Sequence, residues 1–212
     1  MCEVFVLHIS EGILSAPVLA GGAALTLAAL AFSLKQINVQ DVPKTAMLCA
    51  VFFVASLVHV PLGPGSVHLV LAGLLGAILG WGAFVALFVA LLLQAVLFQF
   101  GGLTTLGINT FIMATPAVFL FMLLGRFLTA KNRFLPAAAA FLIGAGSLLG
   151  SGLLAALALF FSGSYFGSTA KLIFLAHLPL AVVEGLITFA CVQFLRKVKP
   201  DILPQNLSSV SH

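Results

Sequence analysis

Charged side chains are scarce in this sequence. Asp, Glu, Lys and Arg make up 7% of its 212 residues, and hydrophobic residues make up 62%. A water-soluble domain carries about 25% charged residues, so a chain this poor in charge cannot cover a soluble surface and belongs in lipid. The net charge of +4 comes from basic residues spread over short segments rather than gathered on one face. We therefore expect no nucleic-acid partner.

Other signatures are missing as well. Cys2, Cys49 and Cys191 show no C-x-x-C spacing, which excludes a disulfide framework. Residues 1–11 contain no Lys or Arg, whereas a secretory signal peptide opens with basic residues, so we expect the first helix to stay in the mature protein. Walker A, G-x-G-x-x-G and Ser/His/Asp signatures are also absent. The chain therefore offers no means of hydrolysing ATP, and active transport would need a partner.

Long apolar segments fill the chain and predict an all-α bundle of about seven transmembrane helices. A helix needs about 20 apolar residues to cross the hydrocarbon core. The stretch 45–125 carries no charge, so Gly- and Pro-rich breaks must divide it. The expected spans are 13–34, 46–60, 67–80, 83–100, 107–125, 134–162 and 172–195. They form a single transmembrane domain over 1–203, followed by a polar tail over 204–212.

The basic residues predict the orientation of this bundle. Cytoplasmic loops carry an excess of Lys and Arg. With the N-terminus outside and the C-terminus cytoplasmic, only Lys171 of the nine basic residues lies outside. The other eight are Lys35, Lys44, Arg126, Lys131, Arg133, Arg196, Lys197 and Lys199. We expect a multi-pass protein of a bacterial inner membrane in this orientation.

Histidines at the expected outer face are candidate metal ligands, since neutral imidazole binds transition metals. His8 precedes the first span, and His59 ends the second. His68 is expected in the first turn of a helix capped by Ser66, where the positive helix end favours neutral imidazole. His8 and His68 could instead be interfacial residues bonded to a backbone carbonyl, and His59 could be a polar residue at the level of the lipid headgroups. Asn109 could simply cap the helix that begins near residue 110.

His177 and Glu184 are candidates of a different kind. They lie seven residues apart and so share a face of the last helix. Glu184 falls near mid-membrane, where ionisable groups are costly and functional. The pair could couple ion movement to a partner, form a structural hydrogen-bonded pair, or contact another subunit. Glu184 is expected to lie too deep, and too far from the outer face, to ligate the ion.

Four segments carry recognisable signatures: HISEG at 8–12, PGSVHLV at 64–70, GGLTTLGINTF at 101–111 and AHLPLAVVEGLIT at 176–188. In this order they resemble the motifs of the CbiM/NikM family, the substrate-binding components of energy-coupling-factor (ECF) nickel and cobalt transporters. The similarity covers about residues 7 to 203. The chain departs from the family pattern at Ser10, where proline is common, and at Ile112, where asparagine is expected.

The resemblance implies a single metal-uptake domain that captures Ni(II) or Co(II) as its transported substrate, with no permanently bound cofactor. The implied ligands are the N-terminal amine, the backbone nitrogen and imidazole of His8, and the imidazole of His68. This all-nitrogen, near-square-planar set suits Ni(II) and accepts Co(II). Glu11, His59 and Asn109 would support these ligands or line the access path. The implied partners are an ECF transmembrane coupling subunit, separate ATPase subunits and a small accessory membrane protein.

The amine ligand requires a chain that begins at Leu7, but six residues precede it. We expect translation to start at position 7, or residues 1–6 to be removed by proteolysis. Replacement of the amine by Cys2 is a third route.

Two other functions compete with metal capture. An S component, a secondary transporter or a passive channel for another small solute would need a larger pocket or a wet pore, and no special role for His8. A membrane-embedded metalloenzyme could use His59, His68, His177 and Glu184. Such an enzyme would be expected to carry a compact motif such as H-E-x-x-H, which this sequence lacks.

Overall fold

The computed structural model describes residues 9–57, 59–62, 65–132, 134–163 and 167–204. Within them, residues 59–62, 65–68, 167–174 and 176 are described by their backbone alone. Leu7 and His8 therefore lie outside the described residues, and for His59 and His68 only the backbone is described.

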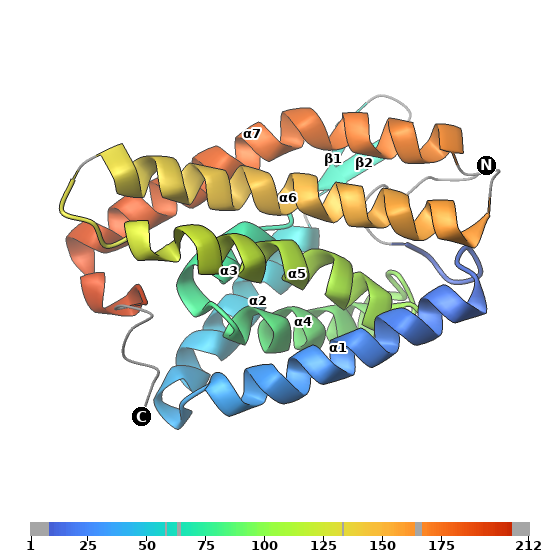
Figure 1. Ribbon diagram of the computed structural model, residues 1–212, viewed down its shortest axis with the longest axis horizontal. Coiled ribbons are helices and arrows are strands. Elements are labelled where there is room, and N and C mark those ends of the chain that lie inside the picture. The colour runs from blue at the N-terminus through green and yellow to red at the C-terminus, as the bar shows by residue number, and fades with distance from the viewer. Residues whose placement is uncertain (1–8, 58, 63–64, 133, 164–166, 205–212) are drawn as a thin grey trace.

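Helices dominate the described part of the chain, which confirms the predicted all-α class. The seven helices are α1 (Ala16–Gln36), α2 (Val42–Leu57), α3 (Ala72–Leu79), α4 (Gly82–Phe98), α5 (Leu106–Leu124), α6 (Phe134–Ser162) and α7 (Gly167–Val198). A short antiparallel hairpin of β1 (His59–Leu62) and β2 (Gly65–His68) joins α2 to α3. Figure 1 shows α1 beginning at one end of the bundle and α7 ending at the other, as an odd number of crossings requires.

Within the described residues, five segments are long and apolar enough to cross a membrane: Ala16–Gln36, Val39–Leu57, Leu106–Phe127, Phe134–Ser162 and His177–Val198. The apolar α4 is shorter, with 17 residues. These helices make the chain a multi-pass membrane protein.

The expected helix over 67–80 is wrong in its first half. Residues up to His68 belong to β2, and α3 has only eight residues. At about 1.5 Å per residue such a helix is about 12 Å long, too short to cross a membrane alone. Leu71 explains where it begins, because its φ of +51° is left-handed and cannot lie within a right-handed helix. The chain therefore returns from the hairpin through residues 69–71 and the short helix α3 rather than through one long helix.

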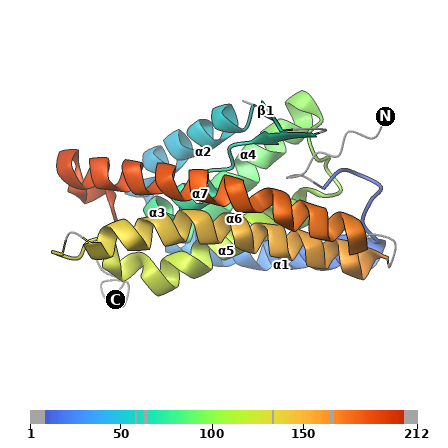
Figure 2. The same cartoon turned by 90° about the horizontal axis from the view of Figure 1, so that it is seen from above.

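The short helix α3 lies inside the bundle, in contact with α4, α5, α6 and α7 (Figure 2). Two glycines permit this close packing. A Cβ added at Gly73 would lie 2.6 Å from the Cα of Gly144 on α6, and one at Gly76 would lie 2.7 Å from the carbonyl oxygen of Ala117 on α5. Small residues allow helix backbones to approach in this way in membrane proteins. The outer helices shield α3 from lipid.

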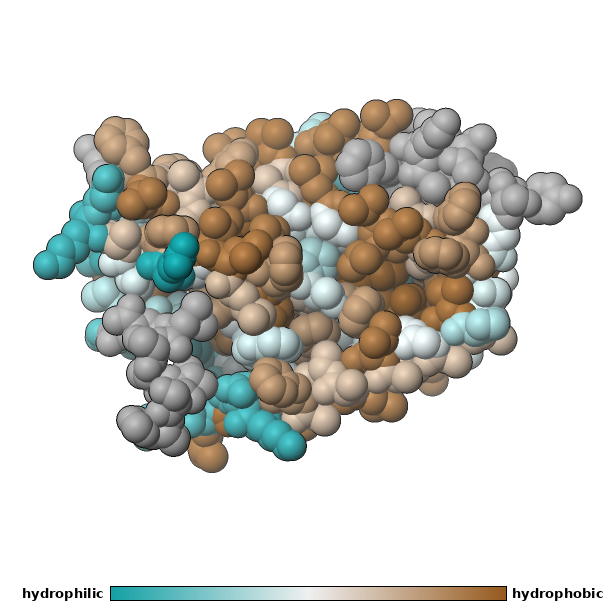
Figure 3. Space-filling view, viewed as in Figure 1, coloured by the Kyte–Doolittle hydropathy of each residue, from teal (hydrophilic) through white to brown (hydrophobic). Residues whose placement is uncertain are grey.

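The outer surface matches a membrane setting. Large apolar side chains such as Leu25, Leu27 and Leu34 of α1 are exposed, as expected of residues that face lipid. Figure 3 shows hydrophobic residues over the body of the bundle and the most hydrophilic ones near the end where α7 terminates. The ends of α1 and α7 carry Lys35, Arg196 and Lys197 there. This grouping agrees with the orientation predicted from the basic residues, which remains a prediction.

Candidate metal site

Asn109 of α5 holds the backbone of Ile9, the residue that follows His8. The Oδ1 of Asn109 accepts a hydrogen bond from the Ile9 N–H at 3.2 Å, and its Nδ2 donates to the Ile9 carbonyl at 3.1 Å. Asn109 is 5% exposed, and Ile9 is buried as well. An amide side chain suits this contact, because its oxygen accepts while its NH2 group donates. The contact therefore fixes both the position and the direction of the chain next to His8.

Asn109 does not cap a helix. The helix α5 begins at Leu106, with Thr105 at its N-cap position, so Asn109 lies inside the first turns. There the Nδ2 of Asn109 also donates to the Oγ1 of Thr105 at 3.3 Å. The expectation of a capping role is wrong, because the helix starts earlier than residue 110, and the side chain is left to hold the N-terminal segment.

Glu11 ties the same segment to the loop before α5. Its N–H donates to the Gly101 carbonyl at 3.1 Å, and its Oε1 accepts hydrogen bonds from the N–H of Thr104 at 3.1 Å and from the Oγ1 of Thr104 at 3.2 Å. Gly102 permits this contact: its φ is +123°, and an added Cβ would lie 2.1 Å from the Cγ of Glu11. Glu11 therefore holds the N-terminal segment against the loop that precedes α5.

The roles of Gly102 and Thr104 were not predicted, although both fall in the recognised GGLTTLGINTF segment. A pair of consecutive glycines indicates unusual backbone geometry, and this signal pointed to the loop. The contact of this loop with Glu11 could not be predicted from the sequence, because Glu11 and Thr104 are 93 residues apart.

The hairpin places the backbones of His59 and His68 opposite each other as paired residues of the two strands. Ser66 also lies in β2, where it pairs with Pro61. The expectation that Ser66 caps a helix carrying His68 in its first turn is therefore wrong. The left-handed Leu71 delays the helix until Ala72.

Glu184 of α7 holds the two residues that precede α3. Its Oε1 accepts hydrogen bonds from the Val70 N–H at 2.5 Å and the Leu71 N–H at 2.9 Å, and its Oε2 also accepts from Leu71 at 2.9 Å. Glu184 is 1% exposed. The N-terminal end of a helix favours a negative charge, which suits a carboxylate at this place.

This contact connects Glu184 to the segment that carries His68, because Val70 and Leu71 follow His68 by two and three residues. The connection was not expected, since residues 69–71 were predicted inside a regular helix, whereas the N–H groups of Val70 and Leu71 bond to a side chain from α7. The expectation that Glu184 does not ligate the ion stays a prediction.

His177 is 2% exposed and lines a cavity of about 10 Å³, roughly the space of one water molecule. Its ring also lies close to Gly152, where an added Cβ would be 3.0 Å from the His177 Cγ. The other lining residues are Val70, Ile112, Met113, Leu148, Ser151 and Ala155.

The cavity links the two held segments. Ile112 and Ala155 line it beside Val70, and both also belong to the apolar cluster that contains Ile9. The segments next to His8 and His68 therefore pack on one region of the bundle. Ile112 contributes an apolar wall here, where the family pattern has asparagine.

Among the described residues, no group of three or more His, Cys, Asp or Glu side chains is arranged to hold a metal ion. The predicted ligands Leu7 and His8, and the side chains of His59 and His68, fall outside that description. The structure therefore locates the residues next to the ligands, and the ligand set itself stays a prediction.

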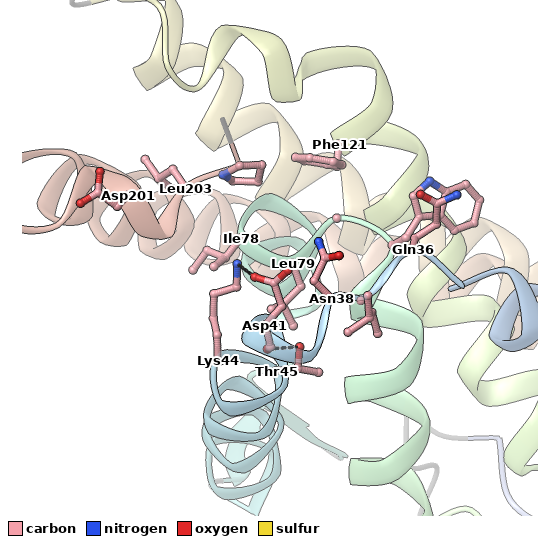
Figure 4. A pocket seen from close by; sticks show the side chains of 15 residues that line it. Gln36, Asn38, Asp41, Lys44, Thr45, Ile78, Leu79, Phe121, Asp201 and Leu203 are labelled. Atoms are coloured by element: carbon pink, nitrogen blue, oxygen red, sulfur yellow. Dashed lines mark hydrogen bonds and ion pairs between the residues drawn. The ribbon is translucent and has the colours of Figure 1, made fainter. Parts of the chain in front are cut away.

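A larger cavity, of about 400 Å³, lies where α1, α2, α3 and the segment after α7 meet (Figure 4). In this region Lys44 Nζ lies 2.9 Å from Asp41 Oδ1, and Thr45 Oγ1 donates to the Asp41 carbonyl at 2.9 Å. The cavity also includes Gln36 at the end of α1 and Asp201 beyond α7. It is therefore at the opposite end of the bundle from residues 9–11 and is separate from the candidate site.

Known proteins share this architecture. Two crystal structures, one of a truncated transition metal transporter and one of a transition metal transporter, share this fold. Each superimposes with a TM-score of 0.70 at 29% identity and covers 90% of this chain, and the matches cover 98% and 93% of the respective structures. A Haemophilus influenzae protein named for metal transport is 39% identical and covers 93% of this chain and 97% of its own length.

Cobalt and nickel both occur among the names of the relatives. A cobalt transport protein CbiM of Kyrpidia tusciae is 30% identical over 99% of this chain and 92% of its own. The fused nickel transport protein NikMN of Rhodobacter capsulatus is 28% identical over 93% of this chain and 64% of its own. Residues 8–202 match the family described as the cobalt uptake substrate-specific transmembrane region. The chain thus belongs to the CbiM family of membrane transport components, as its four signatures predicted.

Proposed function

We propose that this protein is the ion-capturing membrane subunit of an ECF-type transporter that imports Ni(II) or Co(II). The ion binds at the outer face between the amine of Leu7, the backbone nitrogen and imidazole of His8, and the imidazole of His68. The observation that supports this site is the pair of hydrogen-bonded anchors beside it. Asn109 holds Ile9, next to His8, and Glu184 holds Val70 and Leu71, just after His68.

The anchors explain how nitrogen ligands from distant parts of the chain can meet. The Asn109 contact spans 100 residues and the Glu184 contact spans more than 110. Holding both segments in the folded protein removes most of the conformational cost of bringing ligands together, which is the advantage of preorganisation. A near-square-planar set of nitrogen ligands is the geometry that Ni(II) favours.

Inward release is assigned to partner subunits. The sequence has no ATP-binding signature, so ATP hydrolysis takes place on separate ATPases that act through an ECF transmembrane coupling subunit, together with a small accessory membrane protein. No cofactor is permanently bound in this scheme, because the ion is the substrate. The protein itself is not an enzyme.

The mature chain in this proposal begins at Leu7, through a start at that position or removal of residues 1–6. A free amine at Leu7 adjoins His8 and can close a chelate with the backbone nitrogen and imidazole of that residue. Ile9, the next residue, is the one that Asn109 holds.

Native mass spectrometry of the protein expressed from its own gene, after exposure to equal nickel and cobalt, tests the proposed ion site and the proposed start of the mature chain. We expect a mass that lacks residues 1–6 and retains one metal ion, whose mass identifies the preferred metal. His8→Ala and His68→Ala should each abolish ion retention. His212→Ala, in the polar tail, is the matched control and should retain the ion.

A full-length chain that retains no ion would contradict the amine-ligand site. Retention of the ion by His8→Ala or His68→Ala at the wild-type level would do the same. Either result would favour the alternative, a membrane component that transports another small solute.

A further inference from the structure

We infer that Glu184 is a positioning residue of the ion site, whose carboxylate sets the place of His68 by holding the backbone of Val70 and Leu71. This inference rests on the proposed function, in which the His68 imidazole is a ligand. It assigns to Glu184 a role in ion affinity without direct contact with the ion.

Both oxygens of the carboxylate are engaged. Oε1 accepts hydrogen bonds from two successive N–H groups, and Oε2 accepts a second contact from the Leu71 N–H. N–H groups at the start of a helix have no partner within that helix. A carboxylate is the side chain that offers two acceptor oxygens and no donor. The Glu184 carboxylate therefore supplies the acceptors that the N–H groups of Val70 and Leu71 need.

The held residues are close to His68 along the chain. Val70 follows it by two residues, and two residues span at most about 7 Å. Displacement of Val70 and Leu71 therefore moves the backbone of His68. Residues that orient metal ligands through hydrogen bonds typically contribute 10- to 100-fold to metal affinity, although they do not touch the metal.

The position of the carboxylate is itself fixed by the packing of α7 on α6. A Cβ added at Gly144 of α6 would lie 2.7 Å from the Glu184 carbonyl oxygen. The backbone of α7 is therefore in close contact with α6 at Glu184. Glu184 therefore transmits the position of two long helices to the short segment before α3.

The burial of Glu184 indicates that its side chain has a function. An ionisable side chain inside a membrane protein is costly and marks a functional position, and Glu184 is 1% exposed. The acceptor contacts of Glu184 among the described residues go to the segment that follows His68, so the buried carboxyl group is placed to position that segment.

The test compares Glu184→Gln with Thr188→Val in the mature protein that begins at Leu7, purified in detergent. Glutamine keeps the size of the side chain and one acceptor oxygen. It loses the charge and replaces Oε2, which accepts from the Leu71 N–H, with an NH2 donor. Thr188 is fully buried on the same helix, and its Oγ1 has no hydrogen-bond partner among the described residues. Thr188→Val thus alters α7 one turn away without touching the held segment.

Titration with Ni(II) and the ligand-field absorption spectrum of the bound ion are the two measurements. We expect Glu184→Gln to weaken Ni(II) binding by about 10- to 100-fold and to shift the absorption bands at saturating Ni(II), because His68 is displaced. Thr188→Val should keep both the affinity and the spectrum. A purely structural role for Glu184 would leave the spectrum of the bound ion unchanged.

Wild-type affinity and spectrum in Glu184→Gln, with no binding by His68→Ala, would overturn the inference and leave the proposed function standing. Wild-type binding by His68→Ala would overturn the proposed function itself. If Glu184→Gln does not fold, Glu184→Asp provides the test, because it keeps the charge and shortens the side chain by one methylene. A wild-type spectrum and affinity in Glu184→Asp would overturn the inference, and a shifted spectrum would support it.

Discussion

The two segments beside the proposed ligands are held in different ways. The N-terminal segment, at Ile9, is held by a neutral amide that both donates and accepts, with an exposed glutamate, Glu11, assisting nearby. The segment at Val70 and Leu71 is held by a buried carboxylate between two helices. Neutral hydrogen bonds are weaker than those to charged groups. The first segment is therefore expected to be the one that releases more easily, and the second to be part of the bundle core.

The largest effect on folding is expected from Glu184→Ala. Removal of the carboxylate leaves the buried N–H groups of Val70 and Leu71 without a partner, and each such group costs about 1–3 kcal/mol. The free energy of unfolding of the ion-free protein should fall accordingly, measured by thermal unfolding in detergent. Thr188→Val is the control on the same helix. Equal unfolding temperatures for Glu184→Ala and this control would show that the second segment is not part of the core.

Asn109→Leu is expected to affect ion binding more than folding. It removes both hydrogen bonds to Ile9, but this segment precedes the first helix and can separate from the bundle, so its groups regain water. We expect Ni(II) affinity to fall about 10- to 100-fold, measured by titration, with little change in the unfolding temperature of the ion-free protein. Asn132→Leu, at the exposed loop before α6, should retain affinity. A large drop in unfolding temperature for Asn109→Leu would remove the contrast between the two segments.

Gly102→Ala should have the smallest effect of the three. The new Cβ would collide with Glu11, and φ at this residue is +123°, which only glycine adopts readily. The contact between Glu11 and Thr104 should be lost, and Ni(II) affinity should fall by a few-fold because Asn109 still holds Ile9. Gly21→Ala on α1 is the control, since a Cβ there meets no neighbour. Unchanged affinity in Gly102→Ala would show that Glu11 contributes nothing to the site.

Most of the helical architecture could be predicted from the sequence. Spans expected at 13–34, 107–125 and 134–162 correspond to α1, α5 and α6 within a few residues. The expected span at 67–80 failed because apolar composition alone does not distinguish a membrane helix from a strand followed by half a helix. The strand and the helix are separated by Leu71, whose left-handed backbone conformation cannot be predicted from a leucine side chain.

In the candidate site, too, the sequence indicated residues but not their contacts. Asn109 was singled out in a recognised motif at the outer face and Glu184 as an ionisable residue near mid-membrane, and both make buried hydrogen bonds. Their hydrogen-bond partners were not predicted, because these are backbone groups of Ile9, Val70 and Leu71. Any residue other than proline offers a backbone N–H, so the type of residue at these positions does not reveal the contact.

Composition, apolar run length and four ordered motifs by themselves determined that this chain spans a membrane as a helical bundle of the CbiM family. They could do so because transfer into lipid depends on local sequence, segment by segment. Only the tertiary structure decided that α3 is short and buried, that Asn109 faces Ile9, and that Glu184 lies against the segment after His68. These contacts join residues about 100 positions apart, and their formation depends on how the helices pack rather than on any single stretch of the chain.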